Sequence, residues 1–144
     1  MDFPPCKDYV SSDPEETMLL GEKIGALLKQ GDIVALQGEL GAGKTVFARG
    51  IARHLGVKEN LTSPTYTIIS EYEAKSLPLY HMDMFRLSGD DDFRLAGGEE
   101  LLYGTGVCIV EWPERINLPA SAIYVTITIM EDGKRQIRYR FPSQ

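Results

Sequence analysis

Features that mark several special classes of protein are scarce in this sequence of 144 residues. Its two cysteines, Cys6 and Cys108, stand far apart and form no C-x-x-C pattern, which argues against a disulfide framework and a Cys/His zinc site. No apolar run approaches the about 20 residues of a membrane-spanning helix, and residues 1–5 do not begin a signal peptide. We therefore expect a cytoplasmic protein.

Basic residues are also few relative to acidic residues. The 15 lysines and arginines are outnumbered by 21 aspartates and glutamates, which gives a formal net charge of −6. Affinity for nucleic acids comes largely from basic side chains that neutralise phosphates, so this chain is a poor candidate for binding RNA or DNA by itself. The length and the lack of repeats or linker-like stretches indicate a single domain over residues 1–144.

The most informative stretch is G-E-L-G-A-G-K-T at residues 38–45, which fits the G-x-x-x-x-G-K-[ST] pattern of a phosphate-binding P-loop. Its glycines let the backbone turn tightly and bring N–H groups against an anion. Lys44 supplies positive charge for the β- and γ-phosphates, and the Thr45 hydroxyl is suited to ligate Mg²⁺. The predicted nucleotide-binding residues of this loop are Glu39, Leu40, Gly41, Ala42, Gly43, Lys44 and Thr45.

The sequence on either side of the loop has the matching periodicity. Residues 32–37 form a short apolar run typical of a buried strand. Phe47, Ile51 and Leu55 recur every fourth residue, as on one face of a helix. A helix N-terminus that faces a glycine-rich loop favours bound anions. The chain is therefore expected to carry a nucleoside-triphosphate site.

Before the P-loop, D-P-E-E at residues 13–16 combines an N-cap, a first-turn proline and a capping box. This pattern predicts a helix, with Gly31 as its C-terminal stop. Residues 9–12 are expected to form a short edge strand. Ser11 or Ser12 is a candidate contact for adenine, and the alternative is that both are ordinary surface serines.

After the P-loop helix, the β-branched and aromatic residues 66–72 predict a strand. The loop before it occupies the place of a nucleotide-sensing switch in P-loop proteins. Thr65 in this loop is a candidate for orienting water or reaching the metal. The alternative is a simple turn fixed by Pro64.

The strand predicted for residues 79–83 closes with a carboxylate, Asp83. An aspartate in this place is suited to hold Mg²⁺, directly or through water, or to orient the attacking water. The alternative for Asp83 is an ordinary turn residue at the end of a strand. His81 lies two residues earlier and therefore on the same strand face, where it is a candidate for orienting Asp83. The alternative for His81 is a purely structural role.

A second continuous apolar run, residues 106–110, predicts a central strand. It leads to Glu111, which we expect at the same sheet edge as the P-loop, where a metal-binding carboxylate sits. The alternative for Glu111 is an ordinary polar residue at a strand end. Trp112, the single tryptophan, would flank the site.

The last segment has the alternation of a β-hairpin over residues 124–141, with its turn at residues 131–134. Lys134 and Arg135 are candidates for approaching phosphate or base, and a solvated turn is the alternative. Residues 88–98 are rich in Gly and Asp and are interpreted as a solvated loop, followed by a short helical segment at residues 99–103.

Four blocks together resemble the bacterial TsaE (YjeE) family, the small ATPase of tRNA threonylcarbamoyladenosine (t6A) synthesis. They are G-E-L-G-A-G-K-T at residues 38–45, S-P-T-Y at 63–66, H-M-D-M-F-R-L at 81–87 and V-E-W-P at 110–113. Their order and spacing fit the family over nearly the whole chain. Tyr66 and Phe85 are aromatic replacements of the residues that the family usually has.

The resemblance implies an α/β P-loop NTPase fold, with a mixed, mostly parallel sheet flanked by helices and a C-terminal antiparallel hairpin. It implies bound ATP and Mg²⁺, metal binding by Thr45 and Glu111, and a catalytic or water-positioning role for Asp83. It also implies two partners, TsaD and TsaB, which modify adenosine 37 of tRNA, so that tRNA is reached only through the complex. ATP hydrolysis would then support turnover of TsaB–TsaD.

Two other functional classes share part of this pattern. A small-molecule or nucleotide kinase also has a P-loop and Mg²⁺, but needs an acceptor pocket and usually an arginine-bearing lid. A non-catalytic nucleotide-binding adaptor would not need acidic residues such as Asp83 and Glu111 beside the P-loop. A GTPase is disfavoured because the sequence has no N-K-x-D motif.

Overall fold

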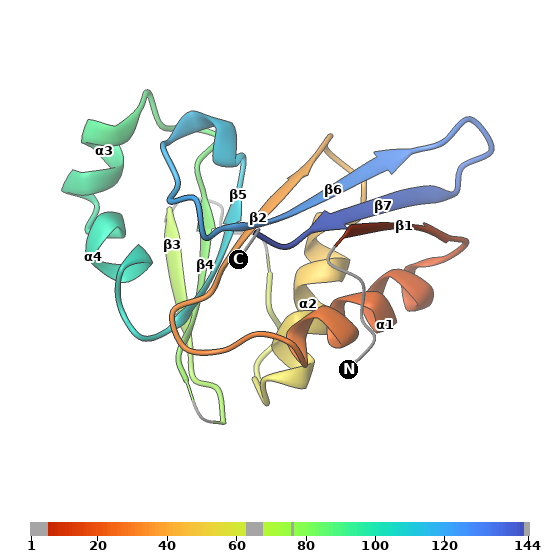
Figure 1. The fold of residues 1–144 in the computed structure, drawn as a ribbon, viewed down its shortest axis with the longest axis horizontal. Coiled ribbons are helices and arrows are strands. Elements are labelled where there is room, and N and C mark those ends of the chain that lie inside the picture. The colour runs from red at the N-terminus through yellow and green to blue at the C-terminus, as the bar shows by residue number, and fades with distance from the viewer. Residues whose placement is uncertain (1–5, 63–67, 76, 143–144) are drawn as a thin grey trace.

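A seven-stranded mixed sheet forms the centre of the computed structural model, which describes residues 6–62, 68–75 and 77–142 (Figure 1). Four neighbouring strands are parallel, and the other three join the sheet in antiparallel fashion at its two sides. This arrangement confirms the predicted mixed, mostly parallel sheet with a C-terminal hairpin. The strands lie in the order β1 (Cys6–Ser11), β7 (Arg135–Arg140), β6 (Ile123–Ile129), β2 (Ile33–Gly38), β5 (Val107–Glu111), β4 (Leu79–Asp83) and β3 (Ile69–Tyr72).

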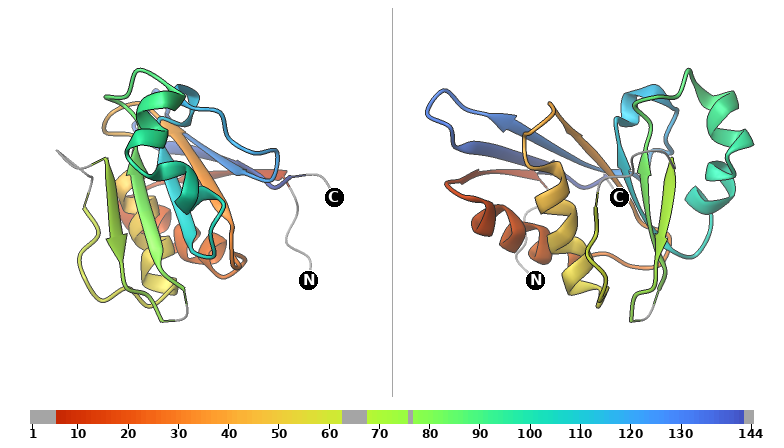
Figure 2. Two further views of the ribbon diagram at one scale, coloured as in Figure 1. Left: turned by 90° about the vertical axis from the view of Figure 1, so that its left-hand side faces the viewer. Right: turned by 180° about the vertical axis from the view of Figure 1, so that it is seen from behind.

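Helices cover the two faces of the sheet unequally (Figure 1, Figure 2). On one face, α1 (Pro14–Gly25) and α2 (Lys44–His54) pack against each other and against a core that includes Val34 and Leu36 of β2. On the other face, the short helices α3 (Asp90–Leu95) and α4 (Gly98–Leu102) add Phe93 and Leu102 to a second core. A 3₁₀ turn, η1 (Pro113–Arg115), follows β5.

The central strands are apolar on both faces because both faces are covered. Every residue of β5 is buried, as are the first four of β2. Cys108 of β5 has no solvent exposure and belongs to the core, and burial raises the pKa of its thiol to about 12. Polar side chains therefore enter this part of the sheet mainly where the strands end.

The predicted end of the first helix needs correction. Helix α1 begins as expected, with the Glu16 N–H donating to Asp13 Oδ1 at 2.9 Å, but it ends at Gly25, not at Gly31. After Gly25, i to i+3 hydrogen bonds replace the helical pattern, with the Leu28 N–H donating to the Gly25 carbonyl. The helix thus stops earlier, and the remaining residues form the turn into β2.

The interpretation of residues 88–98 as a solvated loop is wrong. Three aspartates occupy the first turn of α3, where negative side chains stabilise the helix N-terminus. The Ser88 N–H and hydroxyl donate to Asp92, and these hydrogen bonds lower the pKa of its carboxyl. Phe93 is buried and anchors this helix to the core. The helix expected at residues 99–103 is present as α4.

Close packing of α1 on α2 sets the position of the helix that follows the P-loop. A Cβ on Gly50 of α2 would overlap the carbonyl oxygen of Met18, and a Cβ on Gly21 of α1 would overlap that of Phe47. The two glycines let the helix backbones approach closely.

Within the described residues, no helix is long and apolar enough to cross a membrane.

Candidate nucleotide-binding site

The P-loop connects β2 to α2 at the carboxyl end of the parallel strands. Gly43, which directly precedes α2, has φ 108°, a conformation that favours glycine. Gly38 is required for a different reason, because a Cβ there would lie 2.8 Å from the carbonyl oxygen of Ile127. Glu39 and Leu40 in the loop are exposed, and Ala42 is buried.

Lys44 is the first residue of α2, and its side chain is only 6% exposed. Its Nζ lies 3.8 Å from Glu111 Oε1 and 4.4 Å from the centroid of the Trp112 ring. Neither contact is a hydrogen bond, and within the described residues Nζ has no hydrogen-bond partner. Burying an ammonium group without such a partner is unfavourable. The N–H donors of the Lys44 ammonium group are therefore available to an anion.

Glu111 is the carboxyl-terminal residue of β5 and is 4% exposed. The β4–β5 register places Asp83 directly opposite it, so both predicted acidic residues reach the same edge of the sheet. Asp83 is half-buried, and its Oδ1 accepts a hydrogen bond from the Phe85 N–H at 3.0 Å. This edge combines two carboxylates with the ammonium group of Lys44.

The structure corrects the role suggested for His81. Its ring Nε2 lies 2.5 Å from Glu111 Oε2, so the histidine is paired with the carboxylate of β5 and not with Asp83. The sequence placed His81 and Asp83 on one strand face, but only the strand register shows that Glu111 shares this face one strand away. His81 has no solvent exposure.

Trp112 closes the site beside Lys44 in a strained backbone conformation. It has φ 56° and ψ 52° and is the only non-glycine residue with positive φ in the described part of the chain. Such a conformation costs on the order of 1–3 kcal/mol and persists where the surrounding structure enforces it. The Trp112 ring packs on Phe85 with centroids 4.8 Å apart, and Phe85 is itself 44% exposed.

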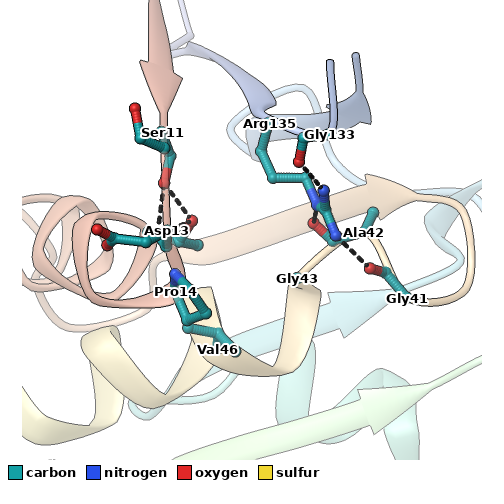
Figure 3. A pocket seen from close by; sticks show the side chains of 11 residues that line it. Ser11, Asp13, Pro14, Gly41, Ala42, Gly43, Val46, Gly133 and Arg135 are labelled. Atoms are coloured by element: carbon teal, nitrogen blue, oxygen red, sulfur yellow. Dashed lines mark hydrogen bonds between the residues drawn. The ribbon is translucent and has the colours of Figure 1, made fainter. Parts of the chain in front are cut away.

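A cavity of about 280 Å³ lies on the other side of the P-loop, between the loop, the start of α1 and the β6–β7 turn (Figure 3). Ser12 and Arg135, two predicted nucleotide contacts, line it together with Gly41–Gly43. Ser11 also lines it, but its hydroxyl is engaged with the Asp13 carbonyl at 2.8 Å and with Thr17.

Arg135 connects the C-terminal hairpin to the P-loop. Its Nε donates to the Ala42 carbonyl at 2.9 Å, and a terminal nitrogen donates to the Gly41 carbonyl at 3.2 Å (Figure 3). Another terminal nitrogen donates to the Gly133 carbonyl. The Arg135 side chain thus braces the loop backbone, whereas Lys134 is exposed in the turn.

Thr45 follows Lys44 at the start of α2 and is half-buried. Thr65 and the rest of the predicted switch loop, Ser63 and Pro64, lie outside the described residues, as do the first two residues of the strand predicted at 66–72. Among the described residues, no three His, Cys, Asp or Glu side chains gather as a cage for a metal ion. Mg²⁺ typically uses one or two protein carboxylates together with substrate phosphates, and Glu111 and Asp83 fit that pattern.

Comparison with known proteins identifies the family. The family described as "Threonylcarbamoyl adenosine biosynthesis protein TsaE" matches residues 11–137. The chain belongs to the TsaE family. This finding confirms the resemblance inferred from the sequence blocks, and it places the chain among proteins named for t6A biosynthesis.

The relatives match over most of their length. A TsaE of Treponema pallidum is 44% identical over 130 residues, which cover 89% of this chain and 96% of the relative. A TsaE of Bacillus subtilis is 42% identical over 129 residues, or 88% and 80% of the two chains. The crystal structure of Bacillus subtilis YdiB has a TM-score of 0.77 and 34% identity, and the match covers 99% of this chain and 90% of that one.

Proposed function

We propose that this chain binds ATP with Mg²⁺ and hydrolyses it as a subunit of the t6A modification machinery in the cytoplasm. The observation that carries the proposal is the buried Lys44 ammonium, which has no hydrogen-bond partner within the described residues and stands at the start of α2 behind a glycine-rich loop. A β- or γ-phosphate would supply both the missing acceptors and the opposite charge.

The proposed roles divide between the two sides of the P-loop. On the buried side, Thr45 and Glu111 would hold Mg²⁺, which neutralises charge on the phosphate oxygens, and Asp83 would position the attacking water. Trp112, beside Lys44, would flank the phosphates. On the side of the cavity, Ser12 and Arg135 would contact the nucleoside. Thr65 is proposed to complete the catalytic group from the switch loop.

TsaB and TsaD are the proposed partners, and tRNA would be reached through them. The net charge of −6 supports this division, because a partner and not this chain would then bind the tRNA phosphates. An arginine finger supplied by a partner accelerates hydrolysis by roughly 10³–10⁵-fold. We therefore propose slow hydrolysis by the isolated chain and faster turnover with TsaB–TsaD.

The test is an ATPase assay, in single-turnover and steady-state form, with and without TsaB–TsaD and tRNA. Thr45→Ala and Glu111→Gln should raise the Mg²⁺ concentration required for activity. Phosphate release should rise when the partners are added. Equal rates with and without partners would refute the proposed partnership, and phosphoryl transfer to a metabolite instead of water would favour a kinase.

A further inference from the structure

His81 is a buried polar residue to which the proposed function assigns no role. It lies in the middle of β4, is fully buried, and faces the same side of the sheet as Asp83. Its Cα partner on β5 is Ile109, so Glu111 lies diagonally across, two residues further toward the site. The 2.5 Å contact between His81 Nε2 and Glu111 Oε2 therefore joins two neighbouring strands just beneath the P-loop.

The two carboxylate oxygens of Glu111 have different partners. Oε2 is hydrogen-bonded to His81, whereas Oε1 is 3.8 Å from Lys44 Nζ, beyond hydrogen-bond distance. The first contact fixes one oxygen to a rigid strand. The second is a looser ionic contact, which a phosphate group on Lys44 and a cation on Oε1 would replace.

The hydrogen-bond inventory of the ring indicates which nitrogen carries the proton. A carboxylate only accepts, so Nε2 donates to Glu111. The other ring nitrogen, Nδ1, is buried and has no partner within the described residues. A tautomer with its proton on Nε2 leaves a lone pair, and not an N–H group, at this unpartnered position. The ring is thus placed to serve Glu111, with its own second nitrogen left unsatisfied.

We propose that His81 is a positioning residue for the metal-binding carboxylate: it holds Glu111 by Oε2, so that Oε1 alone stays directed at Lys44 and at the cation between the strand tips. The inference deepens the proposed function and rests on it. His81 itself touches neither nucleotide nor metal in this arrangement. Its effect is to keep Glu111 in one rotamer, which lowers the cost of ordering it when Mg²⁺ binds. Groups that orient metal ligands in this way are worth about 10- to 100-fold in metal affinity or activity.

Two amide variants separate positioning from mere space filling. The side-chain nitrogen of His81→Gln reaches about as far as the ring Nε2 and is able to donate to Glu111. The shorter amide of His81→Asn takes the place of Nδ1, where no partner lies among the described residues. His81→Phe keeps the volume without a donor. Binding of a non-hydrolysable ATP analogue, followed by Trp112 fluorescence, is measured in EDTA and then during titration with Mg²⁺, because Trp112 is the single tryptophan and lies beside Lys44.

We expect all three variants to bind the analogue in EDTA within about threefold of the wild-type chain, because Lys44 and the P-loop backbone are intact. The Mg²⁺ concentration at half-saturation should rise about tenfold or more in His81→Asn and His81→Phe. It should return to within about threefold of wild type in His81→Gln. An unchanged Mg²⁺ requirement in His81→Asn and His81→Phe would overturn the inference. A parallel loss of thermal stability and of analogue binding in EDTA in all three variants would also overturn it.

A double-mutant cycle tests whether His81 acts through Glu111. In a Glu111→Gln background, His81→Asn should add no further increase in the Mg²⁺ requirement, whereas independent effects would multiply. Multiplying effects would overturn the inference. The outcomes stay distinct from failure of the proposed function, because a wild-type chain that does not bind the analogue with Mg²⁺ would refute the nucleotide site itself before any variant is compared.

Discussion

The centre of the sheet and its outer strands differ in where they place polar side chains. Strands β2, β5 and β4 are parallel and mostly buried, and three of their polar residues, His81, Asp83 and Glu111, lie on the face of β4 and β5 that leads to the site. Strands β1 and β7 are antiparallel, and polar residues recur along them, as in the exposed ion pair between Asp8 and Arg138. Burying a polar group in the central strands costs free energy, whereas the polar groups of the outer strands remain solvated.

The same contrast applies to the two sides of the P-loop. On the central side, Lys44 and Glu111 are nearly excluded from water, so charge interactions there are strong and every missing partner matters. On the outer side, Arg135 reaches the loop from the hairpin and acts on backbone carbonyls at the rim of a cavity. We therefore expect the residues on the central side to take part in ATP hydrolysis and those on the outer side to support nucleotide binding.

The largest expected difference between the central and the outer strands is in the reactivity of their cysteine thiols. The pKa of Cys108 is raised from 9.0 to about 12 by burial, so its reactive thiolate is depleted about 1000-fold relative to an ordinary thiol, whereas Cys6 on β1 is exposed. At pH 8, Ellman's reagent should label one thiol per folded chain, and Cys6→Ser should abolish this labelling. Rapid labelling of Cys108 without unfolding would contradict the description of the centre.

The raised pKa of Cys108 also has a consequence for stability. Above pH 9 the unfolded chain loses the thiol proton while the folded chain keeps it until about pH 12. The free energy of unfolding should therefore fall as the pH rises through this window. Denaturation at pH 8 and pH 10, with Cys108→Ala as the comparison, measures this contribution, which should disappear in the variant.

Asp83→Asn should cause the next largest effect. If Asp83 positions the attacking water, its replacement by a neutral isostere should lower kcat about 100-fold or more and leave the affinity for ATP nearly unchanged. Asp92→Asn on α3 is the matched control, because Asp92 lies outside the site and should leave kcat unaltered. Single-turnover hydrolysis at saturating ATP measures the chemical step. A variant that hydrolyses ATP at the wild-type rate would remove Asp83 from the proposed mechanism.

Lys44→Ala should mainly weaken nucleotide binding. Hydrogen bonds to a charged group contribute about 1.5–3 kcal/mol, which corresponds to a roughly 10- to 150-fold loss of ATP affinity. Lys58→Ala, at an exposed lysine, is the control and should bind as tightly as the wild-type chain. Calorimetric titration with an ATP analogue gives both affinities directly. Unchanged affinity in Lys44→Ala would mean that the nucleotide binds elsewhere.

Arg135→Ala should have the smallest effect of the site variants. It removes bonds that brace the P-loop carbonyls, and a net loss of about 1 kcal/mol would weaken ATP binding roughly fivefold. Arg138→Ala on the same strand is the matched control, because Arg138 pairs with Asp8 away from the cavity and should leave affinity unchanged. If Arg135→Ala and Arg138→Ala weaken ATP binding equally, the cavity rim does not differ from the exposed outer strand in its contribution to ATP affinity.

Local patterns were sufficient to predict much of the fold. The P-loop, its flanking strand and helix, the capping box at Asp13 and the C-terminal hairpin are each encoded within short stretches of sequence. The aspartates of α3 were misinterpreted because three adjacent acidic residues suit both a solvated loop and the first turn of a helix. The buried Phe93, which decides between them, depends on tertiary packing.

The positions of the candidate site residues were predictable where they follow from the ends of parallel strands. They were not predictable where they depend on contacts between segments that are distant in sequence. Glu111 and Asp83 could be placed at one sheet edge because parallel strands end together. The pairing of His81 with Glu111 required the strand register, and the contact of Arg135 with Ala42 joins residues 93 positions apart. The assignment of Thr65 as a switch residue stays a prediction, since it lies outside the described residues.

The central claim is that the buried Lys44 ammonium is the phosphate-binding group of this site. A crystal structure with a non-hydrolysable ATP analogue and Mg²⁺ tests it most directly. We predict that Lys44 Nζ lies about 3 Å from a β- or γ-phosphate oxygen and that the cation lies against Glu111. A nucleotide bound elsewhere, with Lys44 still facing Glu111 and Trp112, would contradict the account.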